Sequence, residues 1–106
     1  MFVIFFKKIL LTFVTIIFTT FVFADDKMEL GLEVFNNKAK CGTCHTLQAV
    51  KSTSNIGPNL DQLKPSMDRI IYSVTNGIGL MQSWDGILTY DEIEAVAYYV
   101  FNNTNK

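Results

Sequence analysis

Two cysteines and a histidine stand together in the sequence, as Cys41, Cys44 and His45 within the segment Cys-Gly-Thr-Cys-His. Two thiols three positions apart, followed at once by an imidazole, have the spacing that attaches a c-type haem. Each thiol adds to one vinyl group at one edge of the porphyrin, and the adjacent imidazole is then held beneath the ring. Histidine is a standard axial ligand of haem iron. We therefore expect covalent haem at Cys41 and Cys44, with His45 as an iron ligand.

Three other interpretations of the two cysteines compete with haem attachment. An exported chain permits a disulfide, but a bridge that closes so short a loop constrains the chain little. A thioredoxin-like redox pair needs a strand–helix–strand context, which the sequence does not display. A structural zinc ion requires four Cys or His ligands, and the chain has two Cys and one His. Haem attachment is the interpretation that we favour.

A six-coordinate haem needs a second ligand opposite His45, and the sequence offers no other histidine. Three methionines are candidates, with lysines as poorer ones. Met28 precedes the motif, so the chain would have to double back. Met67 lies on the apolar face of a predicted helix, where methionine usually fills the core. Met81 lies in an irregular glycine-rich segment that can direct its thioether inward, so we favour Met81 over Met67 or an open site.

Three stretches must position these side chains, because their apolar residues recur at helical spacing. The predicted helices cover residues 28–36, 67–75 and 89–101. Ser66 can cap the second helix, and Thr89 with Glu92 forms a capping box for the third. The stretches between them contain no convincing strand, so we expect an all-α domain without repeats.

Two smaller features bear on how these elements meet. Gly31, inside the first predicted helix, lowers helix propensity and indicates close approach by another element; a flexible N-terminal turn is the alternative. Pro58 lies in a turn by composition. A haem-ligating histidine usually donates its other ring N–H to an oxygen, so the Pro58 carbonyl is a candidate acceptor, the alternative being an ordinary turn proline.

The first 24 residues differ in composition from the rest of the chain. Lys7 and Lys8 precede the uncharged apolar run 9–23, and Ala24 precedes two aspartates. This pattern predicts a secretory signal peptide at residues 1–24, followed by a single domain at residues 25–106 and a periplasmic location. An uncleaved membrane anchor is the alternative, although a span needs about 20 apolar residues.

The predicted mature domain has 82 residues and a formal charge of −3. A domain of this size buries only a modest core, so we expect its folding to depend on haem. The charge is not that of a nucleic-acid-binding surface, and we expect no nucleic-acid partner.

In the order of these motifs, the sequence resembles the class I monohaem c-type cytochromes, the small soluble bacterial and photosynthetic kind. The resemblance covers residues 30–102 and rests on five segments, of which the haem motif is the most specific. They are Gly31 with Phe35, Cys41–His45, Ile56–Leu60, Val74–Gly77 leading to Met81, and Leu88–Val100. The resemblance implies three to four short helices around one covalent haem, with crossing N- and C-terminal helices.

The resemblance also implies residue roles. His45 and Met81 would be the axial ligands, and the Pro58 carbonyl would accept from the His45 ring. Gly31 and Phe35 would pack near Val96 and Tyr99. Trp84 resembles the aromatic residue that closes the haem crevice, although it could be ordinary core. Two features depart from the family: Gln82 replaces the proline that often follows the ligand methionine, and the stretch from Phe35 to Cys41 is slightly long.

The function that this implies is one-electron transfer by a soluble, monomeric carrier rather than an enzyme. Its partners would be transient redox proteins, including membrane oxidase or reductase complexes. Gly57, Gly79 and Gln82 would frame the docking patch, and four lysines could add a basic rim or simply be scattered on the surface: Lys38, Lys40, Lys51 and Lys64. The alternatives are a haem subunit tethered to one redox complex, and a five-coordinate haem protein with a catalytic or sensing role.

Overall fold

The structure is a computed structural model that describes residues 26–106. The predicted signal peptide at residues 1–24 lies outside the described residues. Helical residues 26–33 lead into η1 (Val34–Lys38), η2 (Cys41–Thr43), β1 (Thr46–Leu47), η3 (Gln48–Val50), β2 (Ser52–Thr53), α2 (Leu60–Leu63), α3 (Met67–Asn76) and α4 (Tyr90–Thr104). Within this part of the chain, no helix is both long enough and apolar enough to cross a membrane.

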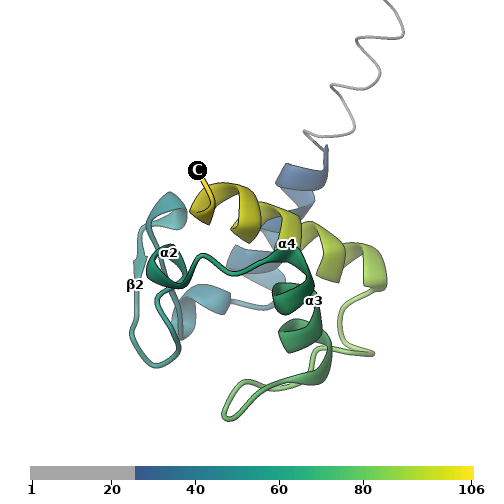
Figure 1. Cartoon of the computed structure of the whole chain (residues 1–106). Helices are drawn as coiled ribbons and strands as arrows, with labels where there is room; N and C mark the ends of the chain where they lie inside the picture. The colour runs from purple at the N-terminus through teal and green to yellow at the C-terminus, as the bar shows by residue number, and fades with distance from the viewer. Residues whose placement is uncertain (1–25) are drawn as a thin grey trace, which may run out of the picture.

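The first helical segment crosses α4 at close range, as the glycine predicts (Figure 1). A β-carbon at Gly31 would stand 2.2 Å from the Ala95 carbonyl oxygen and 2.6 Å from the Tyr99 β-carbon. One turn later, the ring of Phe35 is buried and lies 6.3 Å from the ring of Tyr99, centroid to centroid. The expected crossing of the N- and C-terminal helices is confirmed.

The stretch from Phe35 to Cys41, which is slightly long for the family, contains a π-helix. Residues Val34–Lys38 form a π-helix, which extends the predicted helix from residue 36 to Lys38. A π-turn accommodates an extra residue within a helix without reversing its direction. Phe35 therefore keeps its place against α4 although the chain between it and Cys41 is long.

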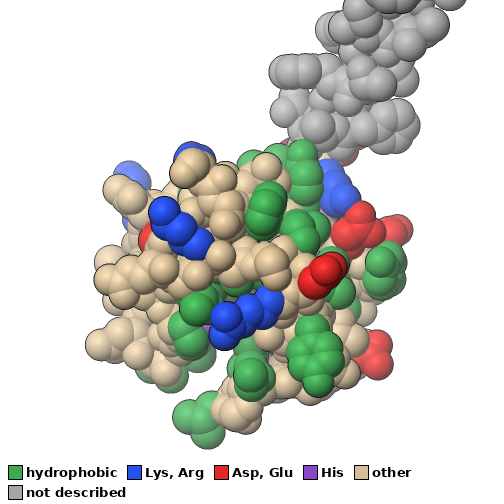
Figure 2. Space-filling view, viewed as in Figure 1, with side chains coloured by type: hydrophobic (Ala, Val, Ile, Leu, Met, Phe, Trp, Pro, Cys, Tyr) green, Lys and Arg blue, Asp and Glu red, His purple; other side chains and the backbone are tan. Residues whose placement is uncertain are grey.

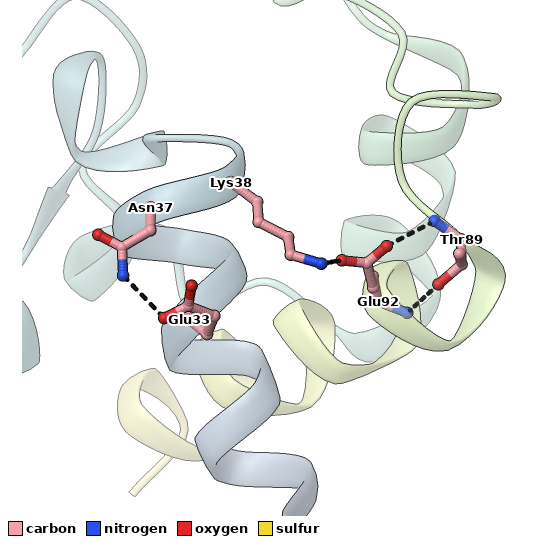
Figure 3. A network of polar contacts seen from close by, with 5 residues as sticks. All are labelled: Glu33, Asn37, Lys38, Thr89 and Glu92. Carbon is pink, nitrogen blue, oxygen red and sulfur yellow. Dashed lines mark hydrogen bonds and ion pairs between the residues drawn. The ribbon is translucent and has the colours of Figure 1, made fainter.

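Side-chain caps begin α3 and α4 where the sequence predicts them. The Ser66 hydroxyl accepts a hydrogen bond from the Arg69 N–H at 3.2 Å. At α4, the Thr89 hydroxyl accepts from the Glu92 N–H at 3.2 Å, and the Glu92 carboxylate accepts from the Thr89 N–H at 3.1 Å (Figure 3). Gly77 ends α3 with a φ of 75°, whereas α4 runs to Thr104, past the predicted end at residue 101.

Two short elements were not predicted. The expectation that residues 46–56 contain no strand is wrong, because Thr46 pairs with Thr53 and Leu47 with Ser52 in an antiparallel ladder. Each strand has only two residues, too few to show an alternating pattern. The second element is α2, a single helical turn capped by Asn59. With α2 included, the number of helices agrees with the upper limit of the three to four that the family resemblance implies.

The core lies where α3 and η1 meet α4. Its buried apolar side chains come mainly from these three elements and include Val34, Phe35, Ile70, Val74, Ile93, Val96, Ala97, Tyr99 and Val100. In Figure 1, α4 passes behind the start of α3, while α2 and β2 lie at the left of the domain. The haem motif begins at η2, which contacts η1 and β2.

Candidate haem site

A cavity of about 340 Å³ opens between α3, α4 and the segment that contains the haem motif. The thiols of Cys41 and Cys44 line it together with His45 and Met81. Most of the remaining wall is aliphatic or aromatic, contributed by residues such as Phe35, Leu60, Ile70, Val96 and Val100. In Figure 2, hydrophobic side chains gather around the hollowed centre of this face. The structure thus brings the three residues of the haem motif and the distant Met81 to one apolar cavity.

The imidazole of His45 is held on two sides by the turn that follows the hairpin. Its Nδ1 lies 2.8 Å from the Pro58 carbonyl oxygen. A β-carbon at Gly57 would stand 2.7 Å from Cε1 of the same ring, so the Gly57 backbone lies directly against it. The Gly57 N–H also donates to the Cys44 carbonyl at 2.7 Å. This turn and the haem motif therefore form one unit that fixes the plane of the ring.

Met81 is presented by a loop that closes on itself. The Ile78 N–H donates to the Met81 carbonyl at 3.0 Å, and the Met81 N–H donates to the Ile78 carbonyl at 2.9 Å. At Gly77, φ is positive and a β-carbon would stand 2.7 Å from the Met81 carbonyl oxygen. The loop is consequently a fixed support for the Met81 side chain rather than an open chain segment.

The other candidate residues lie elsewhere. Among the methionines of residues 26–106, Met28 and Met67 are partly buried against the hydrophobic core, and Met81 alone lines the cavity. Trp84 is also partly buried against the core, and its backbone N–H donates to the Val74 carbonyl at 2.9 Å. Trp84 is not among the residues that line the cavity, and its part in closing the haem crevice stays a prediction.

The residues expected to frame the docking patch differ in whether they line the cavity, and their part in docking stays a prediction. Gly57 lines the cavity, whereas Gly79 and Gln82 do not. None of Lys38, Lys40, Lys51 and Lys64 lines it either. Lys38 instead forms an ion pair with Glu92 on α4 (Figure 3).

Burial changes the chemistry of one motif thiol. It raises the pKa of Cys41 to about 12, and the nearby Cys44 adds to the shift in pKa. A thiol with so high a pKa stays protonated at neutral pH and is a weak nucleophile. Both cysteines are free in the structure. Both also line the cavity, next to His45.

Comparison with known proteins decides between the interpretations of the motif. The family model described as "Cytochrome C oxidase, cbb3-type, subunit III" matches residues 26–100. This chain belongs to the class I monohaem c-type cytochromes.

Relatives of this cytochrome agree with that assignment. It is 32% identical over 88 residues to cytochrome c6 of Tetradesmus obliquus, which covers 74% of this chain and 92% of that protein. It is 37% identical over 78 residues to cytochrome c6 of Euglena gracilis, with 67% and 86% covered. The solved structure of the c-type cytochrome SorU from Sinorhizobium meliloti superposes with a TM-score of 0.72 at 46% identity, covering 77% and 95%.

The cytochrome therefore carries one covalently bound haem c, attached at Cys41 and Cys44, and transfers electrons. The cavity suits this group, because the macrocycle is flat and mostly apolar, as the wall is. Burial of the macrocycle there is favourable by about 25 cal/mol per Å² of apolar surface. Within the described residues, no three His, Cys, Asp or Glu side chains gather as ligands of a metal ion.

Two residues of the cytochrome site have roles that we did not predict from the sequence. Gly57 contacts the His45 ring, a role visible only once the turn is folded against the motif. Arg69 lines the cavity from α3. The sequence places Arg69 on the same predicted helix as the apolar residues Ile70 and Val74. Whether its side chain faces the cavity depends on how α3 packs, which the sequence alone does not reveal.

Proposed function

We propose that this protein is a soluble, exported one-electron carrier in which His45 and Met81 ligate the haem iron from opposite sides. The observation that carries the proposal is that both side chains line the cavity that also contains the two motif cysteines. An imidazole and a thioether together raise the reduction potential of haem iron.

The two ligands are supported unequally by the chain around them. His45 is held by contacts with Gly57 and Pro58, and an acceptor on its second ring nitrogen is the usual arrangement for a ligating histidine. Met81 depends on the paired hydrogen bonds to Ile78 and on the tight packing of Gly77. We therefore expect His45 to be the firmer ligand and Met81 to be the one that leaves first.

An iron with both axial positions filled has no position left for a substrate. This is the physical difference between an electron carrier and a haem enzyme. We accordingly assign the protein no catalytic residues.

The rim of the cavity suits brief contacts with redox partners. Ile56, Ile78 and Leu80 line it and are 68%, 61% and 97% exposed. A small apolar patch beside the haem edge suits weak docking, as transient electron-transfer complexes bury little surface. We propose a periplasmic monomer that docks there on membrane oxidase or reductase complexes or on other redox proteins.

Carbon monoxide binding tests the filled iron site. The reduced wild-type protein should resist carbon monoxide, whereas Met81→Ala should bind it readily. Met67→Ala is the matched control, because Met67 lies against the core and should leave carbon monoxide excluded. Ready binding by the wild-type protein would favour the five-coordinate alternative and a catalytic or sensing role.

A second candidate function follows from the family description, which names an oxidase subunit. In this alternative, uncleaved residues 1–24 tether the same haem domain to one membrane complex. The mass of the protein isolated from its native cells distinguishes the two candidates. A chain that begins at Asp25 supports the diffusing carrier, and a chain that retains Met1 and fractionates with membranes supports the tethered subunit.

A further inference from the structure

The segment that carries Met81 returns to the end of α3 shortly after the methionine. The last carbonyls of an α-helix have no partner within the helix. At the end of α3, the Trp84 N–H donates to the Val74 carbonyl at 2.9 Å. The Ser83 hydroxyl donates to the Thr75 carbonyl at 2.6 Å. Residues that follow Met81 therefore satisfy two of the terminal carbonyls of α3.

The two contacts depend on the sequence to different degrees. The contact of Trp84 is made by its backbone N–H, which every residue except proline has. The contact of Ser83 requires a hydroxyl group at this position. The same hydroxyl oxygen accepts from the Asp85 N–H at 3.4 Å. The Ser83 side chain thus connects the returning segment to α3 by a bond that other residue types would not make.

These contacts restrain Met81 from both sides. Before Met81, the paired hydrogen bonds with Ile78 hold the loop, and a β-carbon at Gly77 would stand 2.8 Å from the Ser83 nitrogen. After Met81 comes Gln82, where a proline would have restricted the backbone. In the absence of that proline, the bond from Ser83 to α3 limits the movement of the loop one residue further along.

We propose that Ser83 is a positioning residue for Met81, because its bond to the Thr75 carbonyl opposes displacement of the methionine from the haem iron. The loop must move when Met81 is displaced, and a loop bonded to α3 then loses this hydrogen bond. The inference rests on the proposed ligation of the iron by Met81. A hydrogen bond of ordinary strength that is lost on displacement changes the equilibrium by about two- to tenfold.

Imidazole binding to the ferric holoprotein tests the proposal. Imidazole competes with Met81 for the iron, and loss of the far-red band of the methionine ligand reports its binding at one fixed pH. Ser83→Ala should bind imidazole about two- to tenfold more tightly than the wild type. Because Ser83 is exposed, this variant leaves no cavity in the core and should fold. Ser83→Thr keeps a hydroxyl group and should retain the wild-type affinity.

Asn76→Ala is the matched control at the same end of α3. The Asn76 side chain donates to the Tyr72 carbonyl at 2.9 Å, so this bond stays within the helix and does not reach the loop. We expect Asn76→Ala to bind imidazole as the wild type does. Equally tight binding by Asn76→Ala and Ser83→Ala would overturn the proposal, since it would reflect a general loosening of α3. A Ser83→Thr protein that behaves like Ser83→Ala would also overturn it.

The spectrum of the wild type separates this inference from the proposed function. If the far-red band is present and Ser83→Ala binds imidazole no more tightly than the wild type, the role of Ser83 is wrong and ligation by Met81 still stands. If the wild type lacks the band, ligation by Met81 is wrong, and the positioning role of Ser83 is wrong with it.

Discussion

Gly31 lies against Ala95 so closely that a β-carbon at residue 31 would stand 2.2 Å from the Ala95 carbonyl oxygen. The crossing of the first helical segment with α4 depends on this contact. It brings Phe35, which lines the cavity, against Tyr99. The position of one cavity wall is therefore set by a residue that has no side chain.

Gly31→Ala should destabilise the holoprotein by about 1–3 kcal/mol, as overpacking usually does. Intrinsic helix propensity would predict the opposite, a gain of about 1 kcal/mol. Urea unfolding followed by circular dichroism measures the difference. Glu29→Ala, at an exposed position of the same helical segment, is the control and should change stability little. A more stable Gly31→Ala protein would show that the two helices do not cross at this residue.

Glu92 should make the stability depend on pH. Lys38 and the Thr89 N–H lower the pKa of its carboxyl group in the folded protein (Figure 3). Its stabilising contribution is then complete above the ordinary carboxyl pKa of about 4.3 and disappears as pH falls through the lower folded value. Glu92→Gln should cost about 1 kcal/mol at pH 7, and the difference from the wild type should shrink under acidic conditions.

A second ion pair, between the helical residues 26–33 and α4, provides the control for Glu92. Lys27 pairs with Glu94, and both side chains are about one-third exposed, whereas the Glu92 side chain is 11% exposed. Exposed pairs contribute little, so Glu94→Gln should have the smaller effect in urea unfolding. Equal losses in both variants, constant with pH, would refute the role of Glu92.

Gly57→Ala should loosen His45, since the new methyl group would stand 2.7 Å from Cε1 of the ring. We expect acid to displace His45 at a pH higher by about 1–2 units, which corresponds to 1–3 kcal/mol of weakened ligation. The change in haem absorption on acidification, measured with both substitutions made in a Met81→Ala background so that Met81 cannot leave first, reports the midpoint. Ile56→Ala changes the adjacent, exposed residue and should keep the wild-type midpoint. Equal midpoints for Gly57→Ala and the wild type would contradict the contact.

Gln82→Pro should make Met81 harder to displace at alkaline pH. Proline reduces the freedom of the unligated loop, which is worth about 0.4–1 kcal/mol. That gain corresponds to a rise of about 0.3–0.7 units in the midpoint of the alkaline transition. Ser83→Ala, one residue further along, does not restrict the backbone and removes the hydroxyl that donates to the Thr75 carbonyl, so it should not raise the midpoint. Identical midpoints for Gln82→Pro and the wild type would dispose of this explanation.

Local chemistry explains which parts of the fold were predictable. Ser66, Thr89 and Glu92 act within one helical turn, so their caps can be read from spacing alone. The haem motif is equally local. The helix crossing at Gly31 was also predictable, because a glycine within a helix indicates a close neighbour. In the structure that neighbour is Ala95.

Tertiary contacts explain what the sequence did not reveal. The hairpin at Leu47 and Ser52 depends on a serine hydroxyl that bonds the Leu47 backbone N–H at 2.9 Å, and polar loops contain many such serines. Arg69 and Gly57 acquire their roles only when α3 and the turn close around the cavity. Trp84 is partly buried against the core, and its role at the haem crevice stays a prediction from the family resemblance.

The most direct test of the central claim is the far-red absorption of the oxidised protein, where a methionine sulfur bound to ferric haem gives a weak band. We predict this band in the wild type and in Met67→Ala, and its loss in Met81→Ala with the reduced c-type spectrum retained. A wild-type protein without the band, or a Met81→Ala protein that keeps it, would contradict ligation by His45 and Met81 and with it the carrier mechanism proposed for this cytochrome.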